Sequence, residues 1–155
     1  MTLQLSAHFT LNEFGGDTIP AACIPTFAIL CVEILEPVRE EFGTKMYITS
    51  GYRSPEDNVM VHGQPTSEHM ATANWCACDF FTVDVQKVFD WMRNNPTLPY
   101  HQLILEKGKV GYVIHVSYNR LKPGVRSVLT GASNNSQPYQ SATFIPFNPT
   151  PEVNV

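Results

Sequence analysis

The amino-acid sequence predicts an α+β domain in which helices pack on a small antiparallel sheet. Apolar residues recur every three or four positions through residues 26–42, which is the period of a helix with one buried face. Short runs rich in β-branched and aromatic residues follow at 45–50, 78–83, 102–106 and 112–117. With 155 residues, of which 43% are hydrophobic, the chain can form one domain with a substantial core. Helices placed before and between short strands are typical of the α+β class.

The N-terminal part of the domain is expected to be helical. Thr10 precedes Glu13 by three positions, a capping-box pattern that predicts a short helix. A long helix is predicted over Thr26–Phe42 and should end at Gly43. Pro37 lies inside it and has no backbone N–H, so we expect a kink or one missing hydrogen bond. The predicted buried face consists of Phe27, Leu30, Cys31, Ile34, Leu35 and Val38.

Strands and a short helix alternate in the middle of the chain. Lys45–Ser50 and Cys78–Val83 are predicted strands because they are short, apolar and partly β-branched. Between them, Arg53–Gly63 is predicted to hold a short helix, since Pro55 suits a first helical turn and the glycine suits its end.

The last third of the domain is predicted to contain one helix and three strands. Asp84 is expected to cap a helix that ends at Asn95, before a proline. Gln102–Glu106 and Tyr112–Ser117 are apolar runs joined by a glycine-containing turn, which indicates an antiparallel hairpin. Arg126–Leu129 is a further candidate strand. The buried face of the predicted helix consists of Val85, Val88, Phe89 and Met92.

A change of composition divides the chain into a domain over residues 1–130 and a tail over residues 131–155. The tail is rich in proline and polar residues and has no sustained apolar period, which is typical of a segment that does not order by itself. Phe144, Ile145 and Phe147 are its candidate anchors. We expect them to dock in an apolar groove of this domain or of a partner, such as a virion protein.

Charge and composition exclude several classes of protein. The formal net charge is −4 and no dense basic run is present, so a nucleic-acid-binding function is not expected. The first residues lack the basic and apolar regions of a signal peptide. No apolar run approaches the roughly 20 residues of a membrane-spanning helix. The sequence therefore predicts a protein made in the cytoplasm without an export signal.

The four cysteines do not predict a disulfide framework. Cys76 and Cys78 are too close for an ordinary disulfide and do not form a C-x-x-C redox motif. Cys31 lies in the predicted helix and is expected to be a buried small hydrophobic residue. A thiol-redox protein or a cysteine-ligated metal site is consequently the weakest hypothesis.

The segment SEHMATANWCACDF, residues 67–80, concentrates groups that can bind a metal. Together with the later VIHVS run, it offers His69, Asp79 and His115, and a catalytic zinc site needs three such ligands with an open fourth position. A single histidine in a strand is more often a satisfied core residue than a ligand. From residue types alone, both interpretations remain open.

The order of motifs along the chain resembles the zinc D-Ala-D-Ala carboxypeptidase and L-alanyl-D-glutamate endopeptidase family, which shares its fold with the hedgehog signalling domain. The likeness is closest to the phage-type members and covers about residues 8–120. It begins with HFTLNEF, which ends at Phe14. The later motifs are LEPVRE at Leu35–Glu40, SGYRS at Ser50–Ser54, GQPTSEH at Gly63–His69, ACD at Ala77–Asp79 and VIHVS at Val113–Ser117.

This resemblance implies a fold, a metal and a set of roles. One Zn²⁺ per chain would be held by His69, Asp79 and His115. Arg53 would direct its guanidinium at a carbonyl or carboxylate of the substrate, where a planar fork allows a two-pronged contact. Ser67 would hydrogen-bond the substrate near the metal. Without metal ligands beside them, Arg53 and Ser67 could equally be a helix-start ion pair and a turn residue.

The sequence departs from the family pattern in two places. Nine residues separate His69 from Asp79, a longer spacing than in the family, with the extra residues around Trp75. A loop absorbs an insertion at little entropic cost, so we expect Asp79 to remain the ligand, with Cys76 or Cys78 as the alternative.

The second departure concerns the proton-transfer carboxylate. Several members place it three residues before the last histidine, where this sequence has Tyr112. The remaining candidate is Glu106, at the end of QLILE, which the hairpin would bring near His115. A surface glutamate at the end of a hairpin is the alternative interpretation of Glu106.

We therefore expect a zinc peptidase that cleaves peptidoglycan stem peptides, as a carboxypeptidase or an endopeptidase. The resemblance implies a phage lysis or virion-associated enzyme that reaches the cell wall after lysis or during entry. The alternative is a catalytically inactive relative that serves as a zinc-binding structural module or a cell-wall-binding module.

Overall fold

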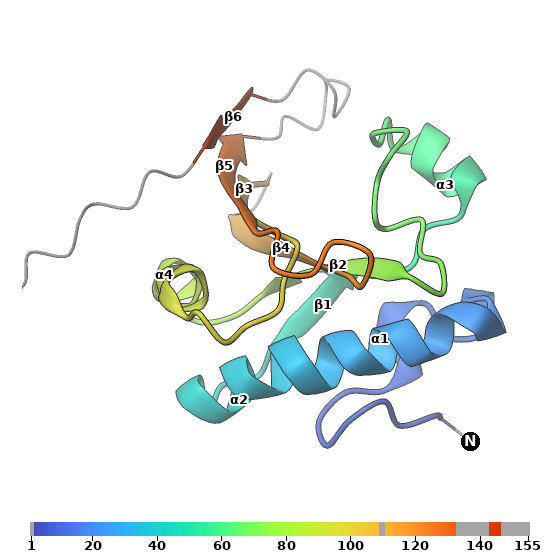
Figure 1. Ribbon diagram of the computed structural model, residues 1–155, viewed down its shortest axis with the longest axis horizontal. Coiled ribbons are helices and arrows are strands. Elements are labelled where there is room, and N and C mark those ends of the chain that lie inside the picture. Colours follow the sequence, from blue (N-terminus) through green and yellow to red (C-terminus); the bar gives the residue numbers. More distant parts are fainter. Residues whose placement is uncertain (1, 109–110, 133–142, 147–155) are drawn as a thin grey trace, which may run out of the picture.

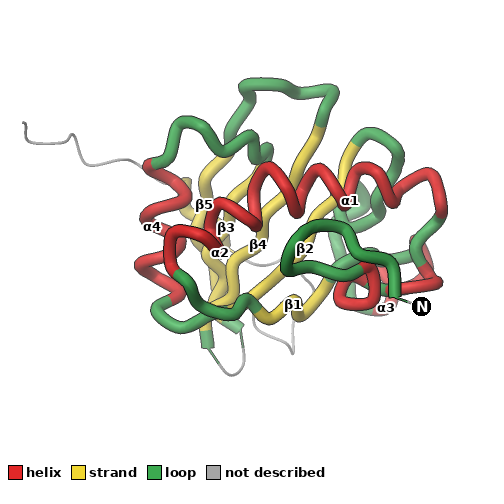
Figure 2. Tube along the Cα trace, turned by 90° about the horizontal axis from the view of Figure 1, so that it is seen from below, coloured by secondary structure: helices red, strands yellow, loops and turns green. Residues whose placement is uncertain are grey.

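The computed structural model describes residues 2–108, 111–132 and 143–146, and it confirms the α+β class. Helices cover one face of a twisted mixed sheet, and a short helix stands beyond the other face (Figures 1 and 2). The covering helices are α1 (Ile24–Leu30), α2 (Glu36–Phe42) and α4 (Val85–Asn94); the short helix is α3 (Pro55–Met60). The strands are β1 (Tyr47–Ser50), β2 (Trp75–Phe81), β3 (Gln102–Lys107), β4 (Tyr112–Asn119), β5 (Ser127–Ala132) and β6 (Thr143–Pro146).

The N-terminal segment contains the predicted capped turn. Leu11–Phe14 forms a 3₁₀ helix, and the Thr10 backbone N–H donates to the Glu13 carboxylate at 2.7 Å, which completes the capping box. Two more 3₁₀ turns, Gly16–Thr18 and Ala21–Cys23, lead into α1.

The predicted long helix is continuous but changes its winding before the proline. A π-helical turn, Cys31–Leu35, joins α1 to α2, and Pro37 lies in the first turn of α2. This turn is the local distortion that the missing N–H led us to expect. Gly43 ends the helix in the left-handed region, with φ of 60°.

By length and composition alone, the segment Ala21–Phe42 would qualify as a membrane-spanning helix, with a mean hydropathy of 1.8. This outcome differs from the expectation that no segment approaches that length. One side of this helix is fully buried against the sheet, as in the core helix of a globular domain. The buried residues include Phe27, Leu30, Cys31, Ile34 and Leu35.

The strand order is β1-β2-β4-β3-β5-β6, and the prediction of an entirely antiparallel sheet is wrong in one place. The hairpin of β3 and β4 is antiparallel as predicted, with Ile104 opposite His115. β5, however, pairs with β3 in parallel. After β4 the chain crosses the end of the sheet and returns on the far side of β3. β3 and β4 are antiparallel, so a strand that lies beside β3 and runs in the opposite direction to β4 is parallel to β3.

The structure also differs from the prediction at β2 and at the start of α4. β2 begins at Trp75 rather than Cys78, because residues 75–77 already pair with Ser117–Asn119 of β4. The strand ends at Phe81. Asp84 does not cap α4 with its side chain. It takes a left-handed conformation, with φ of 56°, and its carbonyl accepts the Val88 N–H at 3.1 Å.

The two faces of the sheet have different compositions. Alternate residues of the strands point to opposite faces. One set faces α1, α2 and α4 and forms the core: Cys76, Cys78, Phe80, Leu103, Leu105, Ile114 and Val116. The other set carries polar side chains, including Asp79, Gln102, Glu106, His115 and Ser117. The open face of the sheet is therefore where chemistry can take place.

Part of the predicted tail extends the sheet. β6 pairs antiparallel with β5, with Thr130 opposite Ile145 and Gly131 opposite Phe144. β5 itself continues to Ala132, across the predicted boundary at residue 130. Phe147, the third predicted anchor, lies outside the described residues.

Candidate metal centre and active-site cleft

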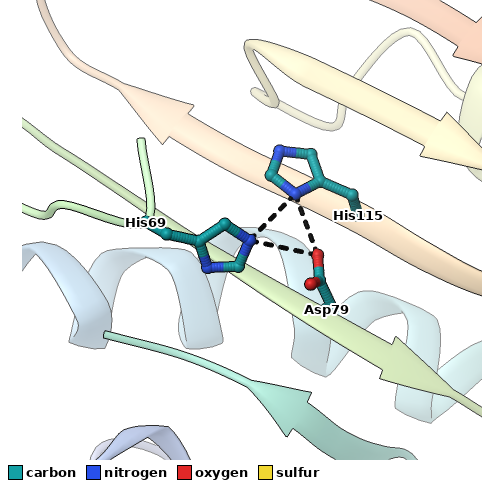
Figure 3. A group of neighbouring side chains, drawn as sticks. All are labelled: His69, Asp79 and His115. Carbon is teal, nitrogen blue, oxygen red and sulfur yellow. Dashed lines mark hydrogen bonds and ion pairs between the residues drawn. The ribbon is translucent and has the colours of Figure 1, made fainter. Parts of the chain in front are cut away.

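Three side chains from three separate elements meet on the open face of the sheet (Figure 3). His69 comes from the loop after α3, Asp79 from β2 and His115 from β4. His69 Nε2 lies 3.2 Å from Asp79 Oδ1 and 3.2 Å from His115 Nδ1, and His115 Nδ1 lies 2.9 Å from Asp79 Oδ1. The structure thus brings together the three residues that the family resemblance implied as zinc ligands.

Strand register explains two of these three positions. Asp79 and His115 are direct partners in the β2–β4 ladder, so their side chains project from the same face. Cys76 and Cys78 project from the opposite face into the helix layer and are fully buried. Burial raises the pKa of both thiols well above its ordinary value. The cysteine alternative to Asp79 is therefore incompatible with the fold.

The long spacing between His69 and Asp79 is absorbed by a compact loop and an early strand start. The Thr72 N–H donates to the Trp75 carbonyl at 2.9 Å, and Trp75 Nε1 donates to the Met70 carbonyl at 3.2 Å. The Thr26 hydroxyl of α1 donates to the Ala73 carbonyl at 2.9 Å, which ties this loop to the helix layer. The insertion leaves the ligand triangle intact.

The outer nitrogen of each histidine is held by an oxygen acceptor. His69 Nδ1 lies 2.8 Å from the Gly51 carbonyl oxygen, and His115 Nε2 lies 3.2 Å from Gln102 Oε1. Because a carbonyl and an amide oxygen can only accept, these nitrogens carry the protons. When both imidazoles are neutral, His69 Nε2 and His115 Nδ1 therefore carry the lone pairs that face Asp79, which is how metal-binding histidines are oriented.

This arrangement fits zinc. Four ligands at about 2.0–2.1 Å from a tetrahedral zinc ion lie roughly 3.3 Å from one another. The three atoms found here are separated by 2.9–3.2 Å, and the two imidazoles and one carboxylate are a typical donor set for a catalytic site. His69, Asp79 and His115 would hold the ion and leave a fourth position for water.

The N-terminal segment supports the site from behind. A side chain on Gly51 would come within 2.3 Å of the Phe14 carbonyl oxygen, so only glycine fits at this contact. The Tyr52 N–H also donates to this carbonyl oxygen, at 2.7 Å. Because Gly51 carries the carbonyl that orients His69, the HFTLNEF and SGYRS motifs form a single supporting unit.

The charged groups of the cluster shift the pKa values of Asp79 and His115 in opposite directions. Burial alone would raise the pKa of Asp79, but the charge of His69 and hydrogen bonds from both histidines outweigh it and hold that pKa well below its ordinary value. Burial alone would lower the pKa of His115, but the hydrogen bond and charge of Asp79 outweigh it and raise that pKa above 6.5. Without metal, the cluster favours a protonated His115 beside an ionised Asp79.

We expect opposite pH dependences for the metal-free and zinc-loaded protein. The raised pKa of His115 stabilises the folded metal-free chain below pH 6.5, and this contribution is lost as the pH rises through the folded-state pKa. Zinc requires neutral imidazoles, so its affinity falls as the pH is lowered. Denaturant unfolding with a chelator should show lower stability at pH 8 than at pH 6, and zinc should stabilise more at pH 8. Equal zinc stabilisation at both pH values would contradict this prediction.

Arg53 is held at the edge of the same cleft. Its Nη1 donates to Asn58 Oδ1 at 3.1 Å, and its backbone N–H donates to the His69 carbonyl at 2.9 Å. Asn58 is buried and donates in turn to the Gln64 carbonyl at 2.9 Å. A side chain on Gly63 would come within 2.0 Å of Asn58 Oδ1, so the glycine makes room for the group that orients Arg53.

Ser67 and Glu106 line the cleft with the three candidate ligands, around a cavity of about 290 Å³. The Ser67 hydroxyl accepts the His69 N–H at 3.3 Å, so Ser67 also shapes the turn that presents His69. Glu106 has only 8% of its surface exposed and shares the face of β3 that carries Gln102 and Ile104. Glu106 is therefore not a surface residue, and its proposed role in proton transfer stays a prediction.

Six residues that line the cleft were not identified from the sequence: Gln64, Thr66, Glu68, Gln102, Ile104 and Leu129. Strand alternation could have revealed Gln102, because it lies four residues before Glu106 and so on the same face. Glu68 gives no such signal, since a glutamate in a loop is normally solvated and only the folded chain shows that it is buried.

One comparison with known proteins identifies the family of the chain. No curated protein and no solved structure matches the chain. The sequence model of one family, peptidase M15, matches residues 7–111, which is more than half of the chain. The matched region contains His69, Asp79 and Glu106 and ends just before His115, which the hairpin brings to the other two ligands. The chain belongs to the peptidase M15 family.

Proposed function

We propose that the protein is a zinc-dependent peptidase that cleaves the stem peptides of peptidoglycan. The observation that carries this proposal is the cluster of His69, Asp79 and His115 in a cleft of about 290 Å³, within a chain of the peptidase M15 family. The polar groups expected for peptide hydrolysis, Arg53 and Glu106, line the same cleft.

Each side chain has a distinct task in this proposal. When bound, zinc lowers the pKa of a water molecule and polarises the scissile carbonyl. Glu106 accepts the proton of the attacking water and delivers it to the leaving amine. Arg53, oriented by Asn58, binds a carboxylate of the substrate or the oxygen of the scissile carbonyl as negative charge develops. Ser67 hydrogen-bonds the substrate backbone beside the candidate ligands.

The phage-type resemblance adds a biological setting to the proposal. The enzyme would act on the cell wall during phage lysis or from the virion, and the segment after residue 130 would attach it to a partner. The products of the reaction will show whether the cleaved bond lies at the carboxyl end of the stem or within it.

Mass spectrometry of digested stem peptides tests the proposed function. The full chain is dialysed against a chelator, divided, and incubated with defined stem tetrapeptides and pentapeptides with or without one equivalent of Zn²⁺. We expect cleavage of one bond only in the zinc-loaded sample. Zinc binding without cleavage of any stem peptide would refute the enzymatic proposal and favour the zinc-binding module instead.

A further inference from the structure

A second pocket adjoins the first on the open face of the sheet. It has a volume of about 460 Å³. Both pockets are lined by the segment Thr66–Glu68 and by Gln102, so these residues form a border common to the two. The two pockets therefore lie next to each other along this border.

Buried hydrogen bonds hold the common border in place. Glu68 has 6% of its surface exposed. Its Oε1 accepts the Ser117 hydroxyl at 2.8 Å and lies 2.6 Å from His101 Nδ1, while its Oε2 accepts from Asn119 Nδ2 at 2.7 Å. These contacts satisfy both carboxylate oxygens inside the protein. Glu68 thus acts as a structural support below the border and not as a free anion in the second pocket.

The outer part of the second pocket combines an apolar surface with one cation. Trp75 is half-buried, and its Nε1 donates to the Met70 carbonyl at 3.2 Å, which fixes the indole ring. Leu121 is 59% exposed and Lys122 is exposed. Among the described residues, no carboxylate forms an ion pair with Lys122. The turn that carries both residues is anchored by Asn119, whose Oδ1 accepts the Leu121 N–H at 3.0 Å.

We propose that the second pocket is a subsite for a carboxylate-bearing portion of the same peptide substrate. Lys122 supplies the counter-charge, and Trp75 and Leu121 contact the aliphatic part of the bound residue. Lys122 is the one lysine or arginine among the described residues that line the second pocket, and its positive charge attracts an anionic group. This inference rests on the proposed function, because the substrate must reach the second pocket from the metal cluster.

Two matched peptides test the subsite. They are stem tetrapeptides that are identical except that one glutamate carboxylate is free in the first and a primary amide in the second. Steady-state kinetics of the zinc-loaded full chain is compared with that of Lys122→Glu. Lys87→Glu is the matched control, since Lys87 is exposed on α4, on the far side of the sheet.

For Lys122→Glu we expect KM for the free-carboxylate peptide to rise about 2- to 20-fold, because an exposed ion pair is replaced by a repulsion. KM for the amide peptide and kcat for both should change little. Leu121→Ser should raise KM for both peptides by a similar factor, and Lys87→Glu should change neither. Equal effects of Lys122→Glu on the two peptides, or no effect on either, would overturn the inference.

If the proposed function is wrong, the kinetic experiment gives a different result from the one expected when only the subsite is wrong. If the wild-type zinc-loaded chain cleaves neither peptide, the proposed function is wrong, and titration calorimetry of the two peptides decides the subsite. Binding of the free-carboxylate peptide that is weakened in Lys122→Glu but not in Lys87→Glu would support it. Equal binding by the two variants, or no measurable binding to the wild type, would overturn it.

Discussion

Replacement of Glu106 by glutamine is expected to lower the turnover of stem peptides by about 100- to 10,000-fold, which is the usual contribution of a positioned acid–base group. Glutamine keeps the size of the side chain and most of its hydrogen bonds but cannot accept the proton of water. Zinc content and melting temperature should change little, because Glu106 lines the cleft without belonging to the ligand triangle.

The control for this variant is Glu40→Gln, which makes the same chemical change at an exposed position of α2. It should retain full turnover. Both variants are assayed with one equivalent of Zn²⁺, so that loss of metal cannot imitate loss of the acid–base group. If Glu106→Gln keeps turnover within about threefold of the wild type, well short of that contribution, proton transfer belongs to another group.

Replacement of His69 or His115 by alanine should abolish stoichiometric zinc binding. Each change removes one of three ligand atoms that lie within 4.8 Å of one another. Gln102→Met is a milder change, because it removes only the acceptor that orients His115. Loss of such an outer hydrogen bond typically costs about 10- to 100-fold in metal affinity, and loss of a ligand should cost more.

Two measurements rank these variants by zinc affinity. They are the metal content after dialysis, determined by mass spectrometry, and competition with a chelator of known affinity. The matched control is His62→Asn, which removes an exposed histidine outside the cluster. Asparagine suits that position because His62 has φ of 56°, in the left-handed region. Full zinc retention in either alanine variant would show that the triangle is not the metal site.

The local elements were the most predictable part of this protein. The capping box at Thr10 and the apolar stripe of the long helix follow from spacing within a few turns of chain, and both are present in the structure. The hairpin of β3 and β4 is predictable for the same reason, since its partners are close in sequence. The family resemblance supplied His69, Asp79 and His115 as candidates before their positions were known.

Features that depend on distant parts of the chain were predicted less well. The β2 boundary was placed late because residues 75–77 become a strand only when β4, about 40 residues later, pairs with them. The parallel arrangement of β3 and β5 depends on a crossover that leaves no local pattern in the sequence. A turn conformation was also missed at Asp84, whose positive φ replaces the expected side-chain cap.

The residues alone established the class of the fold and the helix and strand periods, because these depend on residue types and short spacings. The candidate ligands came from the family resemblance. The folded structure was needed to choose between Asp79 and the neighbouring cysteines, since one step along a strand reverses the face to which a side chain points. It also showed that Glu106 and Glu68 are buried on the site's side of the sheet. Burial of a carboxylate is set by the chain segments that cover it, and those segments are brought together by folding and not by proximity in sequence.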